Sequence, residues 1–319
     1  MLKYIGRRLL AVLPLLFIVS AGVFFLLASL DFDIARAKAG LTGTEEQVAA
    51  IRHQLHLDES LVGQYTRWIS GSLRGDFGES WYGKGDVGAE VRNRLPITAS
   101  IVLPAFLISV IIGLPLGVIS AVRSGGVTDR VITLGSSIGI SMPEFWLASM
   151  LIAFFSVSDH LPLVGRLPAG GYVHPSDSLG EWARHLVLPW FATGMTGAAS
   201  IARQVRANVL EALEQDYIRT ARSKGLAPRA VVYKHALKNA SLPVITVLGI
   251  GLAYSFGGSI VLERIFSING IGQYVGLAIV GQDRPVIQAF VLISALLFVS
   301  INLVVDVLYG VLNPRVRLA

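Results

Sequence analysis

The chain contains no cysteine and few charged residues. None of its 319 residues is Cys, and Asp, Glu, Lys and Arg make up only 15% of them. The missing thiols exclude disulfide bonds, thiolate metal sites and a cysteine nucleophile, and they leave the redox compartment open. A soluble domain carries about 25% charged residues. Because 53% of the residues are hydrophobic, we expect an integral membrane protein.

Six stretches are apolar enough to suggest membrane crossings: residues 9–30, 97–122, 131–158, 186–202, 242–262 and 285–312. A spanning helix needs about 20 predominantly apolar residues. The first stretch is longer than the apolar core of a signal peptide, so we expect a retained anchor. The third is interrupted near Pro143. We therefore predict an all-α membrane protein with six transmembrane helices.

The polar segments suggest how the chain is divided. Residues 1–30 would form a tail and the first helix, residues 31–96 a small external subdomain, and residues 97–319 a five-helix core. Within the subdomain, residues 47–55 and 60–69 have the spacing of short amphipathic helices, and the glycine-rich residues 71–88 are expected to be a loop. Residues 159–185 and 263–284 are also expected to be loops.

The uneven distribution of basic residues predicts the orientation. With six spans, both termini lie on one side, together with the loop at 123–130 and a block at about 203–241. That side carries 15 Lys and Arg but four Asp and Glu, against 12 basic and 15 acidic residues on the other. Lys and Arg are enriched in cytoplasmic loops, so both termini and the block are expected in the cytoplasm.

The basic block lies between two apolar stretches. Helical spacing places four of its apolar residues near one face: Val205, Val209, Leu213 and, one turn later, Tyr217. Gly225 and Pro228 then break the chain. A short helix bounded in this way can protrude from a membrane and bind a partner. On periodicity alone, a basic loop held at anionic lipid headgroups is an equal alternative.

The core of the block reads DYIRTARSKGL over residues 216–226, followed by KHALKNA at 234–240 and Leu-Pro at 242–243. It resembles the cytoplasmic loop of permease subunits in binding-protein-dependent ABC importers, and most closely the dipeptide, oligopeptide and nickel branch. The general loop signature is Glu-Ala-Ala, three residues and Gly; here Arg219, Thr220 and Ala221 precede Gly225. This difference, and the longer distance from Gly to Pro, are typical of the branch.

The resemblance covers nearly the whole chain. Shorter matches follow in the order of the branch, at residues 4–10, 64–68, 75–80, 115–117, 143–146, 302–306 and 313–315. The turn after the first stretch departs from the branch, which has an Ala-Pro-Gly-Asp-Pro-like sequence where this chain has ASLDFD at residues 28–33.

The resemblance implies a type I ABC importer permease fold and a transport role without chemistry of its own. The chain would form half of a pathway for di- or oligopeptides in a bacterial inner membrane, with nickel or another small solute as the alternative. Its partners would be a second, homologous permease, two ATPases that carry ATP and Mg²⁺, an extracytoplasmic binding protein and membrane lipid, with no nucleic acid. The chain itself would bind no cofactor. The residues implied in ATPase coupling are Asp216, Tyr217, Arg219, Thr220, Ala221, Lys224, Gly225 and Leu226.

Two carboxylates lie within apolar stretches. Glu144 follows Pro143 in the interrupted third stretch, and Asp306 lies in the sixth. Ionisable residues at such depth suggest a pathway; the alternatives are that Glu144 satisfies a helix break and that Asp306 bonds to a neighbouring helix. Glu263 and Phe266, at the outer end of the fifth stretch, match a branch motif that suggests an outer gate or a binding-protein contact. A structural turn is the alternative there.

Two near-motifs carry less weight. Residues 78–84 nearly spell a phosphate-binding loop, but Gly85 stands where Ser or Thr would hold Mg²⁺, so we expect no nucleotide site. His53 and His56 form H-x-x-H without the Glu of a zinc protease motif. We expect them to be surface residues of an amphipathic segment, with nickel entry as the alternative, and we predict no metal site.

Two rival functions fit the sequence less well. An intramembrane protease would need a paired catalytic constellation in its apolar segments, and none is evident. An ion-driven secondary transporter would use the two intramembrane carboxylates but would leave the long basic block without a role.

Overall fold

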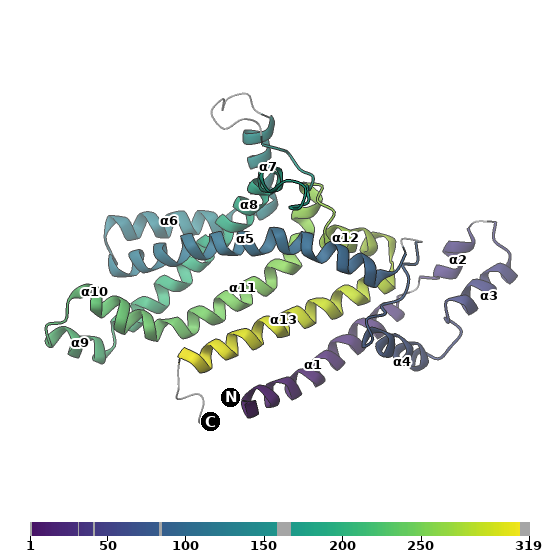
Figure 1. The fold of residues 1–319 in the computed structure, drawn as a ribbon, viewed down its shortest axis with the longest axis horizontal. Coiled ribbons are helices and arrows are strands. Elements are labelled where there is room, and N and C mark those ends of the chain that lie inside the picture. Colours follow the sequence, from purple (N-terminus) through teal and green to yellow (C-terminus); the bar gives the residue numbers. More distant parts are fainter. Residues whose placement is uncertain (1, 31, 41, 83–84, 158–166, 313–319) are drawn as a thin grey trace. The chain divides into compact units, whose positions relative to one another are not determined.

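The computed structural model describes residues 2–30, 32–40, 42–82, 85–157 and 167–312. These residues are mostly helical, and within them the only extended pairing is an isolated antiparallel bridge between Glu79 and Asp86. The prediction of an all-α protein is confirmed. The helices, which Figure 1 follows along the chain, are α1 (Leu2–Ala28), α2 (Ile34–Ala39), α3 (Glu45–Gln54), α4 (Leu61–Ser72), α5 (Val87–Val122), α6 (Val127–Ser141), α7 (Glu144–Ile152), α8 (Leu179–Leu213), α9 (Asp216–Ser223), α10 (Pro228–Ala230), α11 (Leu237–Ile265), α12 (Ile271–Gly281) and α13 (Arg284–Leu312).

The chain divides into two compact units. One consists of residues 2–96 and 274–299, and the other of residues 97–273 with the chain from residue 300. Two π-helical turns, Ala153–Val157 after α7 and Val231–Ala236 before α11, belong to the second unit.

An aromatic cluster in the first of these units holds α4 against α1. The ring centroid of Tyr65 lies 5.4 Å from that of Phe24 and 5.8 Å from that of Phe25. The Tyr65 hydroxyl shares a 2.9 Å hydrogen bond with Ser20, and Trp68 stacks on Phe24 at 5.9 Å. Aromatic pairs at such distances add about 0.5–1.5 kcal/mol each beyond the burial of their area. This cluster therefore attaches the short helices to the first long one.

Polar caps start the short helices. Asp33 caps α2, Thr44 and Gln47 form a capping box at α3, and Ser60 caps α4. Caps of this kind satisfy N–H groups that have no partner within the helix. The predicted helices at 47–55 and 60–69 are confirmed, with shifts of one to three residues at their ends. α2 was not predicted, because six residues are too few to show a periodic pattern.

In the second unit, close backbone contacts pack α5 and α6 against α8 (Figure 1). A Cβ atom at Gly117 of α5 would lie 2.6 Å from the Cβ of Val205 on α8. A Cβ at Gly139 of α6 would meet α8 at 2.9 Å, whereas Gly135 has open space beside it. Small residues allow such approach between membrane helices.

Four helical segments are long and apolar enough to cross a membrane: Leu10–Ala28, Val87–Val122, Pro228–Ile265 and Arg284–Leu308. α6 and α7 with its π-helical turn form a fifth candidate, bent by 93°. Pro143 stands at the bend, where it offers no N–H to continue a helix, so the predicted interruption is confirmed. The remaining predicted stretch, 186–202, lies inside α8. That helix has 35 residues, but it is not among the candidate spans, because Thr, Ser and Gly in its middle lower its mean hydropathy.

Three predicted boundaries are wrong. Residues 271–281, expected to lie in a loop, form α12; glycines at 270, 272 and 281 gave this segment the composition of a loop. α5 begins at Val87, earlier than predicted. Its first turns are polar, so the apolar stretch marks only the later part of the helix. α8 begins at Leu179, where Ser178 caps it, and continues to Leu213, beyond the apolar residues at 186–202.

The α5–α8 contact can be tested with two alanine substitutions. We expect Gly117→Ala to lower the melting temperature of the detergent-purified protein, since overpacking costs about 1–3 kcal/mol. Gly135→Ala is the matched control: it adds the same methyl group in a helix with free space around it, so its melting temperature should stay the same or rise. Equal shifts for the two variants would contradict close packing at Gly117.

Candidate functional site

α9 is a short helix with one buried and one exposed side. Ile218 is fully buried and Ala221 is 6% exposed, whereas Tyr217 is 40% exposed. Asp216 lies in the first turn and Arg222 in the last. Both charges complement the helix dipole, so the local sequence favours a helix here.

Gly225 ends α9 in a left-handed conformation, with φ of +73°. Its N–H donates to the carbonyl of Arg222 at 2.9 Å, and the N–H of Leu226 donates to the carbonyl of Ala221 at 3.3 Å. These two bonds are the pattern of a Schellman motif, which favours glycine at this position. Pro228 then begins α10, where its missing N–H costs no helical bond. The predicted break at Gly225 and Pro228 is confirmed.

α9 packs on a buried cluster that α8 and the π-helical turn at Val231–Ala236 supply. Val205 and Val209 of α8 are buried in it together with Ile218. The prediction that Tyr217 continues their apolar face is wrong. α8 ends at Leu213 and the chain turns through Gln215 before α9 begins, so Ile218 takes the inward position.

The predicted coupling residues lie mostly on the outer side of α9 and in the turn after it. Ala221 faces inward, and the exposed ones are Asp216, Tyr217, Arg219, Thr220, Lys224, Gly225 and Leu226. Arg219 and Asp216 are 3.5 Å apart with side chains 76% and 95% exposed, and such pairs contribute about 0–1 kcal/mol. A surface that combines cations with an exposed Tyr and Leu is suited to binding a protein partner.

A buried carboxylate connects α8 to the turn between α5 and α6. Asp129 is 4% exposed and accepts two hydrogen bonds from Arg206, from Nε at 2.6 Å and from Nη2 at 2.8 Å. Ser120 Oγ donates to it at 2.5 Å and the N–H of Gly125 at 2.9 Å. Forked Arg–carboxylate pairs are strong and directional. The helix that leads into α9 is thus tied to the α5–α6 turn, a link that the sequence analysis missed.

A second buried carboxylate joins α5 to the end of α11 and the beginning of α12. Glu263 is 0% exposed; Thr98 Oγ1 donates to it at 2.6 Å and the N–H of Gln273 at 2.8 Å. Thr98 also accepts from the N–H of Ile271 at 2.9 Å. Phe266 is fully buried in a neighbouring apolar cluster. This geometry fits a structural turn, and a role as an outer gate or binding-protein contact stays a prediction.

The bend between α6 and α7 places Glu144 on the wall of a groove of about 290 Å³, lined from α5, α7, α8 and α11. Pro143 lines a separate apolar depression. Asp306 is 9% exposed on α13 and has bonding partners of its own; it is not among the described residues that line the groove. A pathway role for any of the three stays a prediction.

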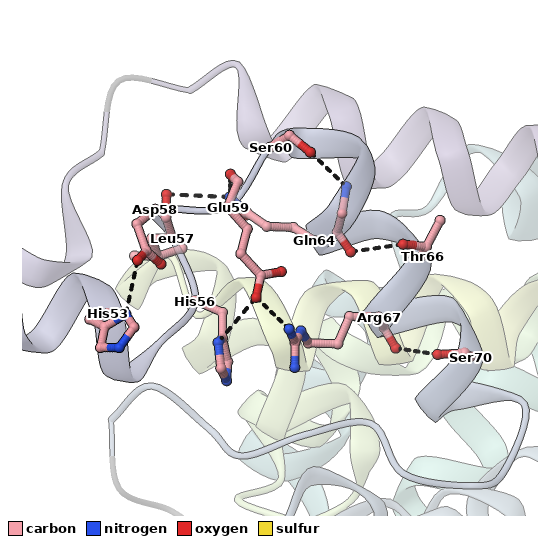
Figure 2. Close-up of polar contacts among 11 residues, drawn as sticks. His53, His56, Leu57, Asp58, Glu59, Ser60, Gln64, Thr66, Arg67 and Ser70 are labelled. Carbon is pink, nitrogen blue, oxygen red and sulfur yellow. Dashed lines mark hydrogen bonds and ion pairs between the residues drawn. The ribbon is translucent and has the colours of Figure 1, made fainter.

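Figure 2 shows the surroundings of the H-x-x-H residues. Nδ1 of His53 lies 2.9 Å from Asp58, and Nδ1 of His56 lies 3.3 Å from Glu59, which also binds Arg67. The hydrogen bond with His53 holds the pKa of Asp58 below its ordinary value. The two His side chains are 82% and 49% exposed, so their predicted surface position is confirmed. In the described ranges no three His, Asp or Glu side chains gather as a metal site would require.

Parts of two sequence motifs lie outside the described residues: residues 83–84 of the near phosphate-binding loop, and the match at 313–315. Before the first of these gaps, Ser80 Oγ and the N–H of Trp81 donate to Asp283 at 2.5 and 3.2 Å. These bonds join the loop to the turn that precedes α13.

The Asp129–Arg206 pair can be tested by stability. We expect Asp129→Asn to destabilise the purified protein by about 1–3 kcal/mol, because it leaves a partly buried guanidinium without a counter-charge. Glu45→Gln is the control, since it breaks the exposed pair with Arg36 and should change the melting temperature little. Reversing the pair with D129R and R206D should not restore stability, because Ser120 and Gly125 also donate to the carboxylate. Equal melting temperatures for D129N and E45Q would refute the link.

The chain matches two models of one transport family. The model described as the binding-protein-dependent transport system inner membrane component matches residues 113–318, and the model for the N-terminal part of such components matches residues 1–102.

Similar proteins and a solved structure agree with these matches. A probable peptide ABC transporter permease protein, y4tP of Sinorhizobium fredii, is 40% identical over 314 residues, 98% of this chain and 99% of that protein. The glutathione transport system permease protein GsiC of Escherichia coli (strain K12) is 39% identical over 317 residues, 99% of each. An inward-facing structure of the MetNI methionine ABC transporter has 20% identity and a TM-score of 0.53 over 70% of this chain and 96% of its own.

The solved structure shows a shared fold, as expected for a type I importer permease, and the sequence matches extend from end to end of the chain. The chain belongs to the family of inner membrane components of binding-protein-dependent transport systems, and it is a multi-pass permease subunit of an ABC importer.

Proposed function

We propose that this permease imports peptides or peptide-like solutes and that α9 is the surface through which it is driven by ATP. The relatives named for peptide and for glutathione transport support the substrate class. The observation that carries the coupling role is α9 itself: its inner side is packed and capped, while Tyr217, Arg219 and Leu226 remain exposed. ATP and Mg²⁺ would bind to separate ATPase subunits, and this chain would perform no covalent chemistry.

The proposed assembly has two permeases, two ATPases and an extracytoplasmic binding protein. This chain would form half of the pathway and a homologous permease the other half. The charge distribution supports an orientation with both termini and α9 in the cytoplasm, where the ATPases would be. Closure of the ATPases on ATP would draw α9 of this chain and the corresponding helix of the second permease together. The Asp129–Arg206 contact would pass that motion from α8 to the α5–α6 turn.

Import of nickel or another small solute through the same architecture is the alternative. Two measurements on the chain expressed with its neighbouring genes test these assignments. The first asks whether an ATPase purifies with the chain, and the second identifies the solute. An ATPase at any reproducible stoichiometry supports the ABC assembly, and its complete absence would instead favour an ion-driven transporter. The ligand retained by the binding protein encoded nearby then identifies the solute, and a retained metal chelate would overturn the peptide assignment.

If the exposed surface of α9 and its following turn binds an ATPase, a charge placed on it should weaken that binding without unfolding the permease. Leu226→Asp places a charge in the apolar part of that surface, and we expect at least a roughly tenfold fall in co-purified ATPase, equivalent to about 1.4 kcal/mol. Leu61→Asp is the matched control, since Leu61 is similarly exposed, at 49% against 41%, on α4 of the predicted external subdomain.

Both variants should be present in the membrane at the level of the unchanged chain. If L226D retains as much ATPase as L61D, the turn after α9 does not contact the ATPase.

A further inference from the structure

The groove beside α7 is lined by one acidic side chain. Glu144 is its only carboxylate, and no Lys, Arg or His is among the described residues that line it. The carboxylate lies beside Thr193, yet its Oε1 atom is buried without a hydrogen-bond partner in the described part of the chain, and so is Oγ1 of Thr193. An unneutralised acid in a groove between membrane helices is costly and is usually functional.

Three hydroxyls that line the groove together with Glu144 donate their protons to backbone carbonyls. Ser109 Oγ lies 3.0 Å from the carbonyl of Ala105 and 2.9 Å from that of Gly194, so its single proton is shared between these two acceptors. Thr196 Oγ1 donates to a carbonyl of its own helix at 3.0 Å, and so does Ser255 Oγ at 2.9 Å. A hydroxyl has one proton and two lone pairs. Because the protons are engaged with backbone carbonyls, the oxygens present lone pairs to whatever occupies the groove.

Glu144 is the first residue of α7, where the helix dipole favours a negative charge and burial disfavours it, so a bound cation would offset the cost of that burial. Pro143 precedes it, and α7 runs on to Ile152. The free N–H groups of a first helical turn favour a negative charge. A carboxylate surrounded by hydroxyl acceptors therefore matches a ligand group that is positive and rich in N–H donors.

From this arrangement we propose that the Glu144 groove binds the ammonium group of the solute during its passage. The groove is about 290 Å³, at the small end of ligand sites, so it holds an end group rather than a whole peptide. An ammonium carries three donors and no acceptor, which suits one carboxylate oxygen together with the hydroxyls of Ser109, Thr196 and Ser255. The assignment depends on the proposed import function, and it adds that solutes with a free amino group are favoured over acylated ones.

The absence of cysteine allows a direct test of this charge preference. In membranes that contain the whole importer, Thr196→Cys or Ser255→Cys gives the chain one thiol on the groove wall. Each variant is treated with a cationic reagent, trimethylammonium-ethyl methanethiosulfonate, and with its anionic sulfonatoethyl counterpart, and modification of this chain is followed after its separation from the partner subunits. Adding Glu144→Gln should lower the cation-to-anion ratio of rates about tenfold, as expected for loss of one nearby charge in a partly solvated site. Glu144→Asp should preserve the preference.

Two results would overturn the proposal. One is a ratio that E144Q leaves unchanged. The other is no modification by either reagent while the exposed control Ser70→Cys reacts, which would show that the groove does not admit polar solutes. Uptake gives a second readout: E144Q should raise KM for a dipeptide with a free amino terminus. Failure of the proposed import function would appear separately, as missing ATPase, and would not alter the thiol rates.

Discussion

The forked contact between Arg206 and Asp129 is the interaction on which the rest of the permease core depends. Apolar contacts and small-residue packing hold α5, α6 and α8 together, but neither fixes a direction. The fork does, because a planar guanidinium and a carboxylate bind in one relative orientation. Ser120 and Gly125 complete the ligand set of Asp129. Since α8 leads directly into α9, the orientation of the proposed coupling surface derives from this one buried pair.

Features controlled by neighbouring residues could be predicted from the sequence. Long apolar runs predict helices, because a chain in lipid must satisfy its backbone internally. Pro143 predicted the break between α6 and α7, and Gly225 predicted the end of α9. Both act through their own backbone, and each needs no knowledge of distant residues. The family resemblance rested on the same local block.

Features that join distant residues could not be predicted. Thr98 and Glu263 are 165 residues apart, and Ser80 and Asp283 are 203 apart. A single sequence gives the chemistry of each residue but not its partner. One signal is present in the sequence: Asp129 is among only four acidic residues on the side predicted to be cytoplasmic, which would carry 15 cations, and an acid so outnumbered suggests a buried pair. Tyr217 does not continue the apolar face of α8, because the chain turns at Gln215 and the helical spacing starts anew in α9.

The Schellman cap at Gly225 has a consequence for the proposed contact between α9 and an ATPase subunit. Both of its hydrogen bonds join residues within six positions of each other, and Ile218 is already buried beneath them. The outward surface therefore exists before any partner arrives, and little conformational entropy is lost when it docks. A preorganised surface of this kind can stay bound to an ATPase subunit while that subunit moves. Movement of the ATPase would then displace the helices of the permease directly, because the contact surface is already folded.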